Sequence, residues 1–215
     1  IEKYGLAVNR KMQDQVLDSM DLERERGITI KAQTVALEYT SNNQDYKINL
    51  IDTPGHVDFS YEVSRSLSAC EGVILIIDAT QGLEAQSIAH TSLAKKLGLE
   101  IIPVINKIDL PSADVEGVKD DLSNLLKIDK SSIIEVSAKT GFGVDRILPS
   151  ILTSVPKPLS DDQKPLRAYI VDSWSDNYLG IVVLIKIIDG KLKLKDKIKI
   201  FSNKKEFTID KLGFF

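Results

Sequence analysis

Polar residues able to do chemistry follow three apolar, β-branched runs of the sequence, at the point where each run ends. The groups are Asp-Thr-Pro-Gly-His at 52–56, Asn-Lys-Ile-Asp at 106–109 and Ser-Ala-Lys at 137–139. Taken alone, each group has a simpler explanation, because polar residues commonly follow a strand where a loop begins. Open parallel sheets bind ligands outside the carboxyl ends of their strands, so three such groups in succession predict a ligand-binding edge.

The elements that must position these groups alternate along the chain. We expect strands at residues 35–39, 46–51, 73–78, 101–105 and 133–136, and helices at residues 57–69, 85–97, 115–126 and 144–155. This alternation, with strands nearly continuous in Ile, Val and Leu, predicts an α/β fold whose mostly parallel sheet is covered on both faces. Only residues 41–45 separate the first two strands, which we expect to form an antiparallel hairpin at one edge of the sheet.

A change of pattern divides the sequence into two domains. Pro156, Pro158 and Pro165 interrupt the periodicity. Only strand-like runs follow, at residues 166–171, 180–188, 197–200 and 206–212. We therefore predict an α/β domain at 1–155, a linker at 156–165 and a partial β-barrel domain at 166–215. The Asp-Gly pair at 189–190 predicts a hairpin between two of the later strands.

The composition is that of a globular protein, with 43% apolar residues, 27% charged residues and a formal net charge of −3. This balance provides no global basic surface, so any contact with nucleic acid has to come from a local patch. The single cysteine, Cys70, cannot form an internal disulfide and indicates a reducing compartment. No apolar run approaches the roughly 20 residues of a membrane-spanning helix, and no signal peptide is visible.

A fourth group, Arg-Gly-Ile-Thr-Ile at 26–30, joins the three strand-end groups. Together they resemble the motif set of a translational GTPase, and within that group the chain is most similar to the LepA family of ribosomal elongation factors, the back-translocase type. The similarity to LepA covers essentially the whole chain and is carried by the strings at 17–33, 52–65, 172–174 and 176–180. It implies a P-loop-NTPase-like GTPase domain, incomplete here, followed by part of a β-barrel domain.

The resemblance implies a base-binding role for the second and third groups. Guanine presents a ring N–H beside an amino group, and the Asp109 carboxylate can accept hydrogen bonds from both, which would select guanine over adenine. Asn106 would bond the acceptor edge of the base, and the stem of Lys107 would cover its face. The other side of the base would be closed by Ser137, Ala138 and Lys139. A turn cap is the structural alternative for Asp109.

The resemblance also implies a phosphate-binding role for the remaining groups, with GTP as substrate and Mg²⁺ as cofactor. Thr29 and Asp52 would hold the ion, the carboxylate through a water, because Mg²⁺ keeps its waters and takes few carboxylates. Gly55 would donate its N–H to the terminal phosphate and flip between nucleotide states. His56 would orient the attacking water, with a helix cap as its structural alternative. We expect His90 to be an ordinary helix-face residue.

A phosphate-binding loop of the form G-x-x-x-x-G-K-[ST] occurs nowhere in the 215 residues. Such a loop supplies backbone N–H groups, a lysine and a hydroxyl that offset the charge of a triphosphate. We therefore expect the chain to lack a central strand and the helix after it, and to bind guanine nucleotide weakly or not at all.

A period-two series of lysines runs through the second domain, at 191, 193, 195, 197 and 199. This spacing predicts all five ammonium groups on one face of a hairpin, which is either a solvated strand surface or a contact with ribosomal RNA phosphate. Lys195 stands where translational GTPases commonly carry glycine, so the sequence departs from the family's pattern at this turn.

The expected function is therefore that of a ribosome-stimulated GTPase. Its partners would be the ribosome, through ribosomal RNA and proteins, GTP or GDP, and also tRNA, with no obligate oligomer. The resemblance implies a cytoplasmic location, extending to the inner membrane face, or an organellar matrix in a eukaryote. Two alternatives stay open: a non-catalytic ribosome- or RNA-binding fragment, and another translational GTPase of the elongation factor G, BipA or initiation factor type.

Overall fold

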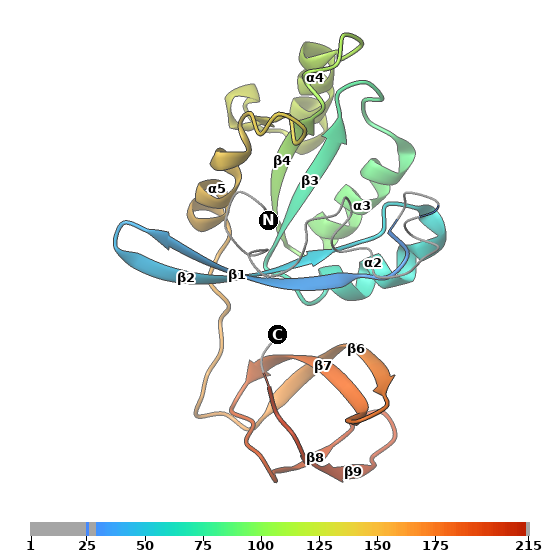
Figure 1. Cartoon of the computed structure of the whole chain (residues 1–215), viewed down its shortest axis with the longest axis vertical. Helices are drawn as coiled ribbons and strands as arrows, with labels where there is room; N and C mark the ends of the chain where they lie inside the picture. Colours follow the sequence, from blue (N-terminus) through green and yellow to red (C-terminus); the bar gives the residue numbers. More distant parts are fainter. Residues whose placement is uncertain (1–24, 26–28, 214–215) are drawn as a thin grey trace. The chain divides into compact units, whose positions relative to one another are not determined.

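The computed structural model describes Glu25 and residues 29–213 of the chain. The chain divides into two compact units, the first ending at Lys157 and the second beginning at Pro158. The first unit contains a parallel sheet with helices on its faces and a separate β-hairpin, and the second consists of β-structure (Figure 1). Residues 17–24 of the LepA-like string and residues 26–28 of the Arg-Gly-Ile-Thr-Ile motif lie outside the described residues.

Strands β1 (Gln33–Ser41) and β2 (Gln44–Asp52) form an antiparallel hairpin. Its turn consists of Asn42 and Asn43, whose φ angles of 51° and 59° are the left-handed values that a tight two-residue hairpin requires. The hairpin is as predicted, but its expected place at the edge of the parallel sheet is wrong for the described residues. It forms a sheet of its own, with no ladder to the parallel sheet among the described residues.

The parallel sheet has the order β3 (Gly72–Asp78), β4 (Glu100–Asn106) and β5 (Ile134–Glu135). The register sets Asp78 directly beside Asn106. Because the strands are parallel, their carboxyl ends finish at the same edge of the sheet. The predicted α/β architecture is confirmed, and it brings the loops after β4 and β5 next to each other.

Helical segments of this unit are η2 (Val57–Phe59), α2 (Ser60–Leu67), α3 (Ala85–Lys96), α4 (Val115–Leu126), η3 (Lys130–Ser132), η4 (Val144–Arg146) and α5 (Ile147–Ser154). Helix α4 has the bounds that the sequence predicts. The Asp114 carboxylate caps it by accepting the Gly117 N–H at 3.0 Å, and Lys127 ends it with a left-handed φ of 59°. Within the described residues, no helix has both the length and the apolar character that a membrane crossing requires.

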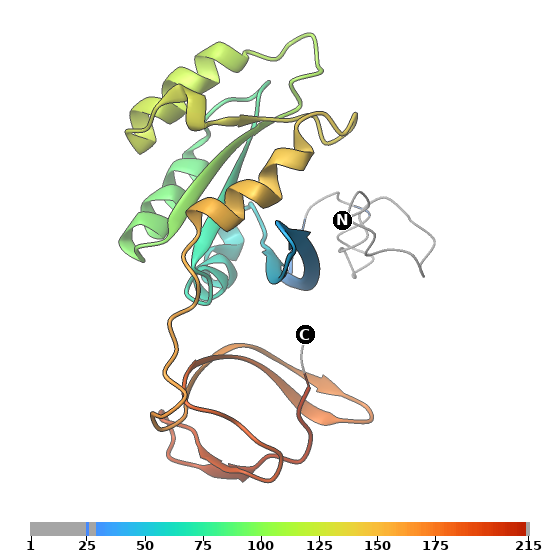
Figure 2. The same ribbon diagram turned by 90° about the vertical axis from the view of Figure 1, so that its left-hand side faces the viewer.

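Two apolar clusters form the core of the first unit, one on each face of the sheet. One joins Leu75, Ile77 and Ile105 to Val118 and Leu122 of α4. The other joins Ile102, Val104 and Val136 to Ile147 and Ile151 of α5. Figure 2 shows α5 on one side of the strands and α3 and α4 on the other. Complete burial of one such side chain contributes about 1.5–3 kcal/mol, so this core holds the strand ends in place.

Coverage of the sheet is less complete than the sequence predicts. Ile76, in the middle of β3, is 59% exposed, whereas its neighbour Ile77 is 1% exposed. Successive side chains of a strand point to opposite faces, and the α5 cluster covers β4 and β5 but does not reach over Ile76. The unbroken apolar run of β3 predicts burial on both faces of the strand. Among the described residues, only the face that carries Ile77 is fully covered at this point.

The second unit consists of two antiparallel pairs. Strand β6 (Arg167–Asp176) pairs with β7 (Gly180–Asp189), and β8 (Lys197–Lys199) pairs with β9 (Glu206–Thr208). The two sheets are not joined to each other by a ladder within the described residues. A β-rich region follows the α/β unit, as predicted.

The hairpin predicted at residues 189–190 does not form, because β7 pairs with β6 and not with β8. Gly190 instead donates its N–H to the Asp161 carbonyl at 3.0 Å. Its φ is 74°, and a Cβ atom there would lie 2.7 Å from the backbone of Leu166. Glycine is needed at 190 because the backbone before β6 passes too close for a side chain, and not because a hairpin turns there.

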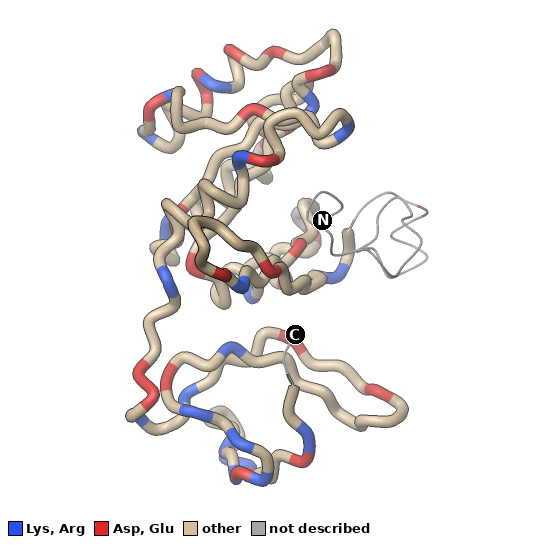
Figure 3. The backbone as a smooth tube through the Cα atoms, turned by 60° about the vertical axis from the view of Figure 1, so that its left-hand side comes forward, with Lys and Arg blue, Asp and Glu red and all other residues tan. Residues whose placement is uncertain are grey.

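The prediction that the five lysines share one face of a hairpin is also wrong. Only Lys197 and Lys199 lie in a strand, and Lys195 has a left-handed φ of 69° that interrupts the alternation. Figure 3 shows basic and acidic positions interspersed along the second unit. Lys195 thus adopts the backbone conformation that glycine adopts most easily.

Candidate functional site

The loop after β4 turns sharply at Lys107, whose φ is 63°. The Leu110 N–H donates to the Lys107 carbonyl at 3.1 Å and closes this turn. Ile108 packs against the core cluster beneath the loop. Ile108 is partly buried, whereas the side chains on either side of it, Lys107 and Asp109, are exposed at the sheet edge.

The loop after β5 is held by Ser137, which is 1% exposed. Its backbone N–H donates to the Phe142 carbonyl at 3.0 Å, and its hydroxyl accepts the Thr140 N–H at 3.1 Å. Ser137 therefore braces the loop from inside, whereas the following residues, Ala138 and Lys139, are exposed.

A hydrogen bond joins the two loops. The Asn106 Oδ1 accepts the backbone N–H of Ala138 at 3.0 Å, across 32 residues of sequence. This bond fixes the orientation of the Asn106 amide: its oxygen points to the Ala138 N–H, and its NH₂ group is left to donate to another acceptor. A donor at this position is complementary to an acceptor on a ligand.

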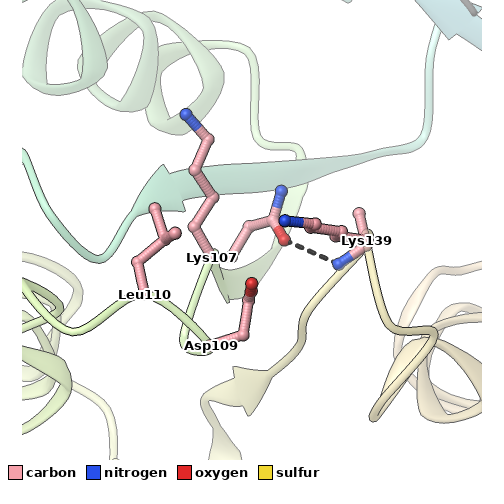
Figure 4. Close-up of a pocket in the computed structure, with 6 residues that line it drawn as sticks. Lys107, Asp109, Leu110 and Lys139 are labelled. Carbon is pink, nitrogen blue, oxygen red and sulfur yellow. Dashed lines mark hydrogen bonds between the residues drawn. The ribbon is translucent and has the colours of Figure 1, made fainter.

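The two loops enclose a pocket of about 220 Å³, and Figure 4 shows how its side chains lie. Its lining consists of Asn106, Lys107, Asp109, Leu110, Ala138 and Lys139. The structure thus brings together five of the predicted base-binding residues and adds Leu110, which the sequence analysis did not assign. The volume is below the roughly 300–1,000 Å³ of sites for drug-sized ligands, and suits a ring system more than a whole nucleotide.

Asp78, at the end of β3, is a neighbour of the pocket that the sequence analysis missed. Its Oδ2 lies 2.6 Å from the Lys107 Nζ. Its Oδ1 accepts the Thr80 N–H at 2.8 Å and the Thr80 hydroxyl at 2.7 Å. Partial burial raises the pKa of Asp78, but the hydrogen bonds from Lys107 and Thr80 lower it more, so the net pKa lies below the ordinary value. The strand-end rule that selected the other groups also applies to Asp78.

The phosphate-side residues of the prediction do not line this pocket. Asp52 ends β2 and is half-buried, as is Thr29, whereas Gly55 and His56 are exposed. The Nδ1 of His56 accepts the Asp58 N–H at 3.3 Å and lies 3.5 Å from the Asp58 carboxylate. An Nδ1 that accepts a hydrogen bond leaves the proton of the neutral ring on Nε2.

His90 makes a contact that its position on α3 did not reveal. Its Nε2 lies 3.5 Å from the Gly55 carbonyl, 35 residues away in sequence. At this distance the interaction is weak. The contact nevertheless places α3 against the loop that follows β2.

Two comparisons relate this geometry to known proteins. The family model for the elongation factor Tu GTP binding domain matches residues 2–157. The crystal structure of a bacterial selenocysteine-specific elongation factor, EF-Sec, is similar over 89% of this chain, with 25% sequence identity and a TM-score of 0.75. The chain spans 34% of the length of that protein.

GTPase domains of this family use GTP and Mg²⁺. The family match covers all of the first unit except Ile1, including the two loops that form the pocket. The chain therefore belongs to the translational GTPases, with a GTP-binding domain of the elongation factor Tu type.

Proposed function

We propose that this chain acts as part of a ribosome-dependent GTPase of the LepA type, and that the pocket between the β4 and β5 loops recognises guanine. The observation that carries the proposal is that a carboxylate, an oriented amide and a lysine stem line one pocket: Asp109, Asn106 and Lys107. Each supplies a different part of the complementarity to the base.

Guanine selectivity would come from Asp109 and Asn106. The Asp109 carboxylate accepts from the ring N–H and the amino group, a pairing that adenine cannot offer. The Asn106 oxygen is already bonded to Ala138, so its NH₂ group donates to the acceptor edge of the base. The stem of Lys107 rises beside the pocket, and Lys139 extends across from the other loop (Figure 4).

The substitution Asp109→Asn tests this assignment. Xanthine has a carbonyl where guanine has its amino group, so an amide at 109 should prefer xanthine. We expect a reversal of preference of about tenfold or more between 5′-GMP and 5′-XMP, because a polar group of the ligand that finds no partner in the site is costly. NMR titration of the Ala138 and Lys139 amides measures both affinities.

Asp120→Asn is the matched control, because Asp120 is an exposed carboxylate that pairs with Lys130 on the surface and does not line the pocket. It should leave the preference for 5′-GMP unchanged. An Asp109→Asn protein that still prefers 5′-GMP to the wild-type extent would contradict the proposed role of Asp109.

Mg²⁺ and the phosphates would be bound on the β2 side. Among the described residues there is no group of three or more His, Cys, Asp or Glu that could hold a metal ion. The Thr29 hydroxyl and Asp52 carboxylate are oxygen donors of the kind that Mg²⁺ takes, and substrate phosphates and waters complete such sites. The ion would neutralise charge that develops on the phosphates during hydrolysis.

His56 would orient the attacking water. Its Nδ1 is bonded to the Asp58 N–H, so Nε2 is the ring atom that can donate to a water. Gly55 precedes it, and a Cβ atom at Gly55 would meet nothing within 4 Å. There is thus room around this peptide for the change of orientation that a nucleotide switch requires.

This chain would bind the phosphates of a nucleotide less tightly than its base, because its 215 residues contain no phosphate-binding loop. We expect GDP to bind this chain far more weakly than a version extended at its N-terminus by such a loop. Calorimetric titration of both proteins measures the difference. Equal submicromolar affinities would contradict the expectation.

The LepA assignment rests on the sequence strings at 17–33, 52–65, 172–174 and 176–180. The similarity to EF-Sec favours a second candidate, another translational GTPase. Both candidates predict binding to ribosomes that depends on a GTP analogue, whereas a non-catalytic RNA-binding fragment predicts binding without nucleotide. Co-sedimentation of the protein with ribosomes, with and without the analogue, separates these two predictions. Addition of aminoacyl-tRNA then tests tRNA as a further partner.

A further inference from the structure

The carboxylate of Asp78 has a separate partner for each oxygen. Oδ1 accepts two hydrogen bonds from Thr80, and Oδ2 faces the Lys107 ammonium at 2.6 Å. Asp78 also lies beside Asn106 in the ladder, so its position is set by the sheet. With 16% of its side chain exposed, the carboxylate is a fixed point at the edge of the pocket.

Lys107 is held at both ends. Its backbone is part of the turn closed by the Leu110 N–H, and its ammonium is bonded to Asp78. The side chain between these points is 53% exposed, and an exposed lysine without such a partner samples many rotamers. Figure 4 shows the stem beside the pocket, on the side of the β3 end. Pairing with Asp78 thus selects, from many conformations, one in which the stem forms a wall of the pocket.

A purely structural ion pair is a poor explanation of this arrangement. Pairs with a partner as exposed as Lys107 contribute little to folding. Lys107 also keeps a left-handed backbone, which is unfavourable for a residue with a side chain. Strained backbone conformations cluster at ligand-binding sites, and binding groups at such sites are held in place by supporting contacts like the one from Asp78.

We infer that Asp78 is a positioning residue of the guanine pocket, acting through Lys107, whose stem it holds against the face of the bound base. This inference rests on the proposed function, because it requires that the pocket binds guanine. It assigns to the end of β3 a role in base recognition beside the ends of β4 and β5.

The test is a double-mutant cycle on the full chain with 5′-GMP as probe, since this ligand carries the base and sugar but needs no triphosphate site. Asp78→Asn keeps the shape of the side chain and removes its charge, and Lys107→Met keeps most of the stem and removes the ammonium. We expect each variant to weaken 5′-GMP binding by about five- to tenfold and the double variant to weaken it no further, because coupled residues are not additive. NMR shifts of the Ala138 and Lys139 amides report the affinity.

Asp120→Asn again provides the control, with an expected affinity equal to that of the wild type. The inference is overturned if Asp78→Asn binds 5′-GMP as the wild type does, if the two single effects multiply in the double variant, or if Asp120→Asn weakens binding equally. In all three cases a wild-type preference for 5′-GMP over 5′-AMP would leave the proposed function intact. A wild type that does not distinguish these two nucleotides would refute the proposed function and the inference together.

Discussion

The proposed base side and the proposed phosphate side of the candidate site differ in how firmly the fold holds them. On the base side, the loops after β4 and β5 are joined by Asn106 and braced by the buried Ser137. On the phosphate side, the loop after β2 carries Gly55 and His56 on its surface, with weaker contacts of 3.3 Å to Asp58 and 3.5 Å to His90.

This difference suits the two tasks of a nucleotide switch. A base is the same in the diphosphate and the triphosphate, so the groups that read it can be fixed before binding. The groups that sense the terminal phosphate must change between the two states, and segments that move are those with few restraining contacts. The comparison therefore predicts that a substitution on the base side lowers the free energy of unfolding more than an equivalent substitution on the phosphate side.

Two glycine substitutions should show the largest difference. Gly143, in the base-side loop, has a φ of 70°, and a Cβ atom there would lie 2.2 Å from the Glu135 carbonyl oxygen. We expect Gly143→Ala to lower the free energy of unfolding by about 2–4 kcal/mol, because it combines backbone strain with a clash. Gly55→Ala should change it by less than about 0.5 kcal/mol, because its surroundings are open. Urea denaturation of both variants measures the contrast, and equal losses would break the comparison.

Removal of one hydrogen-bonding side chain from each side should show a smaller difference. Asn106→Ala removes the bond to the Ala138 N–H and should cost about 1 kcal/mol of unfolding free energy. His56→Ala removes an acceptor from an exposed loop and should cost less than about 0.5 kcal/mol. Amide hydrogen exchange provides a second readout, since Ala138 should lose protection only in the Asn106 variant. Unchanged protection there would show that the two loops are held together by other contacts.

The pH dependence of stability should show the smallest effect. The pKa of Asp78 is lower in the folded chain than its ordinary value, so its contribution to stability is complete above an unfolded-state pKa of about 3.9 and is lost as the pH falls through the folded value. Asp78→Asn should therefore be less stable than the wild type at neutral pH, by about 0.5 kcal/mol after allowance for the exposed lysine. The gap should close below about pH 4. A constant gap from pH 7 to pH 3 would assign the effect to packing instead of charge.

Local patterns predicted much of the first unit. The bounds of α4 agree with its apolar period, its aspartate cap and its left-handed end at Lys127. The strand ends at Asp52 and Asn106 were located by the change from apolar to polar residues. The lysine series of the second unit failed as a prediction because Lys191 and Lys193 lie in no strand and Lys195, with its left-handed backbone, ends the alternation before β8 begins.

The sequence by itself determined the α/β class, the order of the elements and the chemical groups at the strand ends, because these depend on residue types and short periods. Only the tertiary structure decided which of those groups meet. The bond from Asn106 to Ala138 and the ion pair from Lys107 to Asp78 join residues 32 and 29 positions apart. Their contact depends on strand register and on the direction of two turns, which no local pattern encodes.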